Sequence, residues 1–147
     1  MFKSIAVLCL FLAVSSARQI TTTKCGSAAG SVQNINVEPC DSDVCAFKPN
    51  MKVTITGELV PTVAAAAPTL SVQVEVSGFF VEYPGLSKNA CDYLACPLKA
   101  NEPNKFKIEV ETLDWLPPME TDMQFHMYAS DGGEELACAQ ARIAVTA

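Results

Sequence analysis

Apolar and polar residues alternate with a period of two over much of the chain. This period places successive side chains on opposite faces of a β-strand, whereas an amphipathic helix repeats about every 3.6 residues. The alternation is clear in residues 53–59, 70–76, 106–111, 123–129 and 142–146, and weaker in 32–37 and 79–83. No segment shows a helical repeat of apolar residues. The pattern therefore predicts about six to eight short strands, each with one face toward a core.

Turn-forming residues separate the predicted strands. They lie at Pro49-Asn50, Gly85, 101–104 and 131–133. Residues 64–67, four alanines between Pro61 and Pro68, are predicted to form a loop or a crossing at a sheet edge. Many antiparallel strands with one apolar face pack as two sheets face to face. The predicted fold class is therefore all-β, a single immunoglobulin-like two-sheet sandwich.

The N-terminus carries the features of a secretory signal peptide. Lys3 precedes an apolar run over residues 5–14, and the small residues Ser15 and Ala17 follow. We expect residues 1–17 to be the signal peptide and 18–147 the mature domain. A membrane anchor is the alternative, although the run is shorter than the ~20 apolar residues that span a bilayer. The predicted localisation is extracellular, or the lysosomal or endosomal lumen.

Cysteine usage agrees with export. The chain has seven cysteines, and Cys9 lies in the predicted signal peptide. The remaining even number predicts three disulfides in an oxidising compartment, with the pairing left open by the sequence alone. Cys40 and Cys45, like Cys91 and Cys96, have a spacing that zinc ligands also use, but export argues against thiolate ligands.

Charge and the remaining titratable residues narrow the function. The formal net charge is −6, which disfavours nucleic acid and anionic membranes as partners. His126 is the single histidine and falls on the outward register of its strand, so we expect a surface histidine and no metal site. No nucleophile elbow is present. A hydrolase is therefore the least favoured function, and no cofactor is expected.

The order of several short motifs resembles one family. The motifs are Cys25-Gly26, Pro39-Cys40 followed by Cys45, the segment 81–86, Asn89-Ala90-Cys91, Cys96-Pro97-Leu98, and Cys138 near the end. This arrangement is similar to the MD-2-related lipid-recognition (ML) domain family. Within it, the Niemann-Pick type C2-like proteins and arthropod members such as the group 2 mite allergens are most similar.

The resemblance implies a fold, a disulfide pairing and a function. It implies a two-sheet sandwich with the disulfides Cys25–Cys138, Cys40–Cys45 and Cys91–Cys96. It also implies a non-enzymatic monomer that holds a sterol, fatty acid or similar lipid between the sheets and releases it to a membrane or receptor. An innate-immune lipid-recognition or co-receptor module of the same fold is the alternative function.

The candidate lipid-binding residues are mostly inward-facing apolar positions of the predicted strands. In sterol-binding relatives an aromatic residue near the position of Tyr83 helps to form the pocket. If Tyr83 points inward, Val81 and Phe79 share its face and Phe80 points outward. An apolar stripe is equally what an ordinary core needs, so a pocket is inferred from the resemblance. The candidate set is Val72, Val74, Phe79, Val81, Tyr83, Ile108, Val110, Leu113, Trp115, Leu116, Phe125 and Met127.

Overall fold

The computed structural model describes residues 16–147 of the chain. The predicted signal peptide lies outside the described residues apart from its last two positions. In the part described, no helix is long and apolar enough to cross a membrane. Ten strands and one short 3-10 helix, η1 (Ala90–Asp92), are present in this part. The strands are β1 (Arg18–Gln19), β2 (Thr23–Lys24), β3 (Ser31–Glu38), β4 (Cys45–Phe47), β5 (Lys52–Val60), β6 (Thr69–Val76), β7 (Phe79–Glu82), β8 (Asn104–Glu111), β9 (Met119–Tyr128) and β10 (Glu135–Val145).

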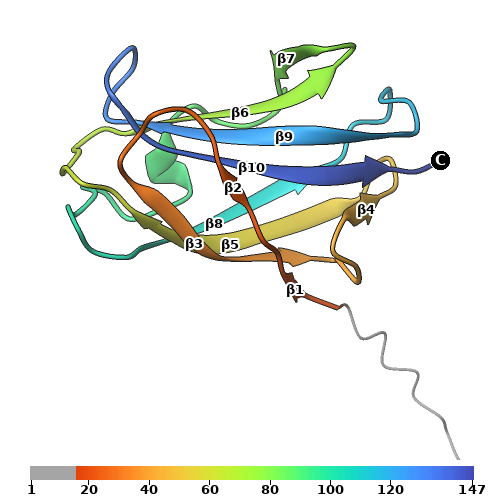
Figure 1. Ribbon diagram of the computed structural model, residues 1–147, viewed down its shortest axis with the longest axis horizontal. Coiled ribbons are helices and arrows are strands. Elements are labelled where there is room, and N and C mark those ends of the chain that lie inside the picture. Colours follow the sequence, from red (N-terminus) through yellow and green to blue (C-terminus); the bar gives the residue numbers. More distant parts are fainter. Residues whose placement is uncertain (1–15) are drawn as a thin grey trace, which may run out of the picture.

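The strands form two sheets that pack face to face (Figure 1). The four-stranded sheet, called sheet A here, has the order β1-β3-β5-β8. The six-stranded sheet, sheet B, has the order β2-β10-β9-β6-β7, and β4 pairs in parallel with the end of β10. The predicted all-β two-sheet sandwich is confirmed. At one edge of the sandwich β1 lies near β2, and at the other Tyr83, which follows β7, hydrogen-bonds to the end of β8.

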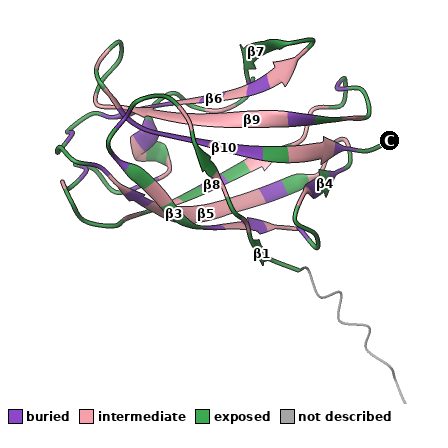
Figure 2. Ribbon diagram, viewed as in Figure 1, coloured by how far each residue is buried: buried purple, intermediate pink, exposed green. Residues whose placement is uncertain are grey.

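The observed register explains the alternation of the sequence. In sheet B, Val72 pairs with Phe125 and Val74 pairs with Met123. Phe125 in turn pairs with Ala139 of β10. Paired residues of antiparallel strands point to the same face, so these side chains form one apolar layer toward sheet A. Buried positions accordingly lie between the two sheets, whereas β7 is exposed along its length (Figure 2).

Three disulfides cross-link the chain. They are Cys25–Cys138, Cys40–Cys45 and Cys91–Cys96, the pairing that the family resemblance implies. The first joins residues 113 positions apart and connects the end of β2 to the neighbouring strand β10. The other two each close a short loop, one before β4 and one around η1.

Candidate functional site

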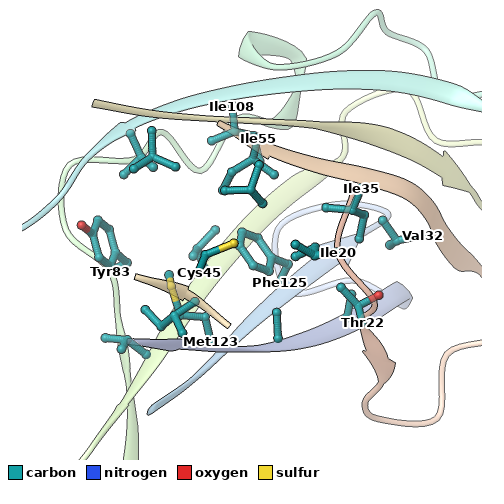
Figure 3. A pocket seen from close by; sticks show the side chains of 18 of the residues that line it. Ile20, Thr22, Val32, Ile35, Cys45, Ile55, Tyr83, Ile108, Met123 and Phe125 are labelled. Atoms are coloured by element: carbon teal, nitrogen blue, oxygen red, sulfur yellow. The ribbon is translucent and has the colours of Figure 1, made fainter. Parts of the chain in front are cut away.

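An apolar cavity lies between the two sheets. Its volume is about 200 Å³, on a measure by which a single water needs about 10–15 Å³. Aliphatic, aromatic and methionine side chains from both sheets form most of its wall (Figure 3). The space between the sheets is therefore large enough for much more than trapped water.

Small residues on β10 help to leave this space open. Ala137, Ala139 and Ala141 are buried, and all three line the cavity. They lie beside the longer side chains of β9, since Ala137 pairs with Met127 and Ala139 with Phe125. A row of larger residues on β10 would fill the inter-sheet space in the way an ordinary core is filled.

Sequence reasoning missed this row. The predicted strand at the C-terminus covered residues 142–146, whereas β10 covers Glu135–Val145. Alanine has low β-propensity, which hid the strand. The available signal was the period-two spacing of the three alanines over residues 137–141.

Most of the predicted site residues meet at the cavity. Tyr83 and Leu113 come from opposite sides of the β7–β8 edge, and Ile108 comes from sheet A, opposite the side chains of β6 and β9. The predicted residues that line the cavity are Val72, Val74, Tyr83, Ile108, Val110, Leu113, Leu116, Phe125 and Met127.

Phe79, Val81 and Trp115 do not line the cavity. These three residues are 74%, 40% and 58% exposed, respectively. Val81 pairs with the inward-facing Val74, so Val81 lies on the face of sheet B that its predicted register gives it. The expectation that Phe79 and Val81 face an inter-sheet space is nevertheless wrong, because the exposed β6–β7 hairpin lies at the edge of sheet B, where the opposite sheet does not cover it (Figures 1 and 2). Trp115 lies on the β8–β9 loop and points to solvent while Leu116 beside it is buried.

Tyr83 closes the β7–β8 edge of the cavity. It follows β7 directly, and its amide donates to the carbonyl of Val72, which holds it beside β6. Its hydroxyl donates a 3.0 Å hydrogen bond to the backbone carbonyl of Glu111 at the end of β8. Burial raises the pKa of the Tyr83 hydroxyl; a hydrogen bond with the Leu113 backbone lowers it in part, and the negative charge of Glu111 adds to the increase.

The cavity extends to the opposite edge of the sandwich. Ile20, Thr21 and Thr22, which connect β1 to β2, line it there. In Figure 3, Ile20 and Thr22 lie at one end of the cavity and Tyr83 at the other. Sequence reasoning missed these three residues, because a three-residue crossing is too short to carry a periodic signal.

His126 is outward in register, as expected, but it is mostly covered. It pairs with Ser71 and Cys138 on the outer face of sheet B. Its Nδ1 lies 3.5 Å from a carboxylate oxygen of Glu135, and its side chain is only 14% exposed. His126, Glu135 and Cys138 form the one cluster of potential metal ligands among residues 16–147. The sulfur of Cys138 belongs to a disulfide, so it is not available as a thiolate ligand.

The geometry suits an apolar ligand rather than a charged one. Arg142 belongs to the cavity wall, but its guanidinium forms ion pairs with Asp122 and Glu120 on the outer face. Asp43 lies at the edge and pairs with Arg18. Apolar walls with few polar groups at the ends are typical of sites that bury lipids and similar molecules. The fold and cavity together define the class of β-sandwich proteins that enclose an apolar molecule between their sheets.

Comparisons with known proteins agree with this class. Residues 19–145 match the model of the ML domain family. The mite group 2 allergen Lep d 2 of Lepidoglyphus destructor is 31% identical over 102 residues, which cover 69% of this chain and 70% of the allergen. The NPC intracellular cholesterol transporter 2 homolog a of Drosophila melanogaster is 24% identical over 138 residues, covering 91% of this chain and 93% of the homolog. A solved structure of a Niemann-Pick type C2 protein from the Japanese carpenter ant covers 86% of this chain with 99% of its own, at a TM-score of 0.75 and 16% identity.

The chain therefore belongs to the ML domain family. Members of this family are lipid-binding proteins and not enzymes, and family membership implies the same class of function for this chain.

Proposed function

We propose that this protein is an exported carrier that takes up one sterol, fatty acid or similar apolar molecule between its sheets. It releases this ligand at a membrane or to an acceptor protein. The observation that carries the proposal is the cavity of about 200 Å³, whose walls are almost entirely apolar and which reaches both edges of the sandwich.

Burial of apolar surface supplies the binding free energy in this proposal. At about 25 cal/mol per Å² of apolar area, covering roughly 300 Å² of ligand gives about 7 kcal/mol before the costs of association. Met123 and Met127 on β9 both line the cavity. Unbranched, polarisable methionine side chains adapt to ligands of different shape, which suits a carrier of more than one lipid.

Three disulfides and the signal-like N-terminus support export. Disulfides of this number persist in secretory and extracellular compartments. The single-domain sandwich is proposed to act as a monomer, because one chain supplies every wall of the cavity. A mite group 2 allergen and NPC2 proteins are among the relatives of this chain, which does not favour the immune co-receptor alternative.

The decisive experiment identifies the lipid that accompanies the protein. The chain is expressed with its leader in a secretory host, purified from the medium, and analysed by native mass spectrometry and by lipid extraction. We expect one bound lipid per chain, displaced by a fluorescent fatty acid or sterol. A protein that carries no lipid and binds neither probe would contradict the proposal.

A further inference from the structure

Residues 18–24 form a strap across one edge of the cavity. Its first strand, β1, belongs to sheet A and its second strand, β2, belongs to sheet B. The crossing residues Ile20, Thr21 and Thr22 all line the cavity. Figure 1 shows this segment running from the lower sheet to the upper one. At this edge, the strap is therefore a part of the cavity wall that spans both sheets.

The strap is attached to sheet A by a few non-covalent contacts. β1 pairs with β3 only through Arg18 and Gln19. The amide of Ile20 adds one 2.9 Å hydrogen bond to the carbonyl of Ile35. The ion pair of Arg18 with Asp43 lies in solvent, where such pairs are weak and screened by salt.

The strap is attached to sheet B covalently. Cys25 follows it directly and forms the disulfide with Cys138 of β10, and the Cys25 amide donates to the Cys138 carbonyl at 3.1 Å. Between these two attachments, Thr21 and Thr22 form no hydrogen bond with any other described residue. One end of the strap is thus fixed, and the other is held by contacts that break reversibly.

The opposite edge of the cavity is linked more firmly. There the Tyr83 hydroxyl bonds to the carbonyl of Glu111, and the Lys107 amide donates to the carbonyl of Tyr93 at 2.9 Å. The segment that carries Tyr93 is itself closed by the Cys91–Cys96 disulfide. Opening this edge requires several links between the sheets to break together.

We propose that the strap is the gate through which the ligand enters and leaves the cavity. β1 detaches from β3, and the segment swings about its hinge at the Cys25–Cys138 disulfide, which opens the cavity beside Ile35. Closure restores the wall and excludes water from the bound ligand. The gate rests on the proposed function, since it assumes that the cavity holds a lipid.

A cross-strand disulfide tests the gate directly. Gln19 and Asn36 are paired, and they flank the hydrogen-bonded pair of Ile20 and Ile35. They therefore form a non-hydrogen-bonded pair, whose Cα atoms lie about 4.5 Å apart, within the range that a disulfide bridges. Gln19 is exposed and Asn36 is flanked by buried neighbours on the other face, so the lock Gln19→Cys/Asn36→Cys leaves the cavity lining unchanged.

Two control variants accompany this lock. Gln19→Ser/Asn36→Ser removes the same side chains without a cross-link. Thr56→Cys/Lys107→Cys places a lock elsewhere in sheet A: the two residues are paired, and the Lys107 amide donates to Tyr93 instead of to β5. This pair is therefore also non-hydrogen-bonded and can be cross-linked in the same way.

The readout is the rate of exchange of cis-parinaric acid, a fluorescent fatty acid, measured by stopped flow. Locking a gate slows ligand entry and exit by the same factor and leaves Kd unchanged. The lock raises the barrier to ligand passage but changes neither the free nor the bound state. We expect the strap lock to slow both rates by about tenfold or more, with Kd within about twofold of the wild type. Rates equal to those of the two controls would overturn the gate and assign ligand passage to the Tyr83 edge.

Hydrogen exchange gives a second measurement that needs no ligand. We expect the Ile20 amide to exchange by local opening, faster than the amides of β5, and to be protected by the lock. If the wild type binds neither cis-parinaric acid nor a fluorescent sterol, the proposed function fails, and exchange alone then decides whether the strap opens. An Ile20 amide as protected as the core amides would show that it does not.

Discussion

The hydroxyl of Tyr83 donates a hydrogen bond of 3.0 Å to the backbone carbonyl of Glu111, and this bond joins sheet B to sheet A at the β7–β8 edge. Tyr83 is only 8% exposed, and its ring also lines the cavity. One residue is thus part of the wall and a link between the sheets. Substitutions at this position separate the two roles.

Replacing Tyr83 by phenylalanine removes the link and keeps the wall. We expect Tyr83→Phe to lower the free energy of unfolding by about 1 kcal/mol, because the Glu111 carbonyl loses its partner, and to retain ligand binding. Tyr83→Glu places a carboxylate against the apolar cavity, so binding should be lost and stability should fall by about 2–4 kcal/mol. Chemical denaturation and titration with a fluorescent fatty acid check both variants. Full binding by Tyr83→Glu would remove this residue from the site.

The ionisation of Tyr83 should be visible at alkaline pH. Its pKa is raised first by burial, so the folded state holds the proton more tightly than the unfolded state. The stability contributed by the neutral hydroxyl is full below the unfolded pKa of about 10 and is lost as pH rises through the folded value. A tyrosinate titration followed by ultraviolet absorbance should show a late step that Tyr83→Phe reduces by the absorbance of one tyrosine. The control is Tyr128→Phe, because burial also raises the pKa of Tyr128. A titration unchanged by Tyr83→Phe would contradict the assignment.

Filling the cavity should separate binding from folding. Ala139 is buried on β10 and lines the cavity beside Phe125. We expect Ala139→Phe to lower the affinity for the lipid at least about tenfold. The free energy of unfolding should change by no more than about 3 kcal/mol, since the added ring occupies empty space. Ala144→Phe, on the outer face of the same strand, is the matched control and should bind normally. Equal affinity of the two variants would argue against a ligand in this cavity.

The three disulfides should differ in their contribution to stability. The loop between Cys25 and Cys138 spans 113 residues and each of the other two spans 5. In the chain-entropy model, replacing both cysteines of the long loop by serine should cost about 4–5 kcal/mol, and replacing a short-loop pair about 2 kcal/mol. Denaturant midpoints of the three double variants test the order. A short-loop variant that is the least stable would show that native packing, rather than loop length, dominates.

Ligand binding should depend little on ionic strength. The charged groups of Arg142 and Asp43 at the cavity edges are paired with other residues, and the walls are apolar. Salt screens charge–charge interactions but does not weaken the burial of apolar surface. We expect the Kd for a fluorescent fatty acid to change less than about threefold between low and high salt. A collapse of binding at high salt would indicate recognition of a charged headgroup instead.

The sequence predicted the sheets better than it predicted their edges. The alternation over residues 70–76 and 106–111 marked β6 (Thr69–Val76) and β8 (Asn104–Glu111) to within about two residues, because the two faces of these strands differ strongly in polarity. The face on which Phe79 and Val81 lie also followed from the period. Their exposure did not, since coverage by the opposite sheet depends on where that sheet ends, and no local pattern carries this information.

The period-two alternation also predicted the cavity-lining residues of the strands, but it did not predict those at the edges of the sheets. Val72, Phe125 and Ile108 were found because a cavity wall and a core wall share one pattern. The row of alanines on β10 and the crossing at Ile20–Thr22 were not found. Whether an inward face encloses empty space depends on the summed volumes of side chains from both sheets, and this sum is known only once the strands are paired.

The Cys25–Cys138 disulfide also determines what a protease can do to this molecule. Every loop from the β2–β3 connection to the β9–β10 connection lies between these two cysteines in the chain. A single cut in any of these loops leaves two fragments that remain one covalent molecule. The nicked protein therefore migrates as an intact chain on a non-reducing gel and separates only after reduction, and its two fragments stay joined at β10, the strand that carries the alanine row.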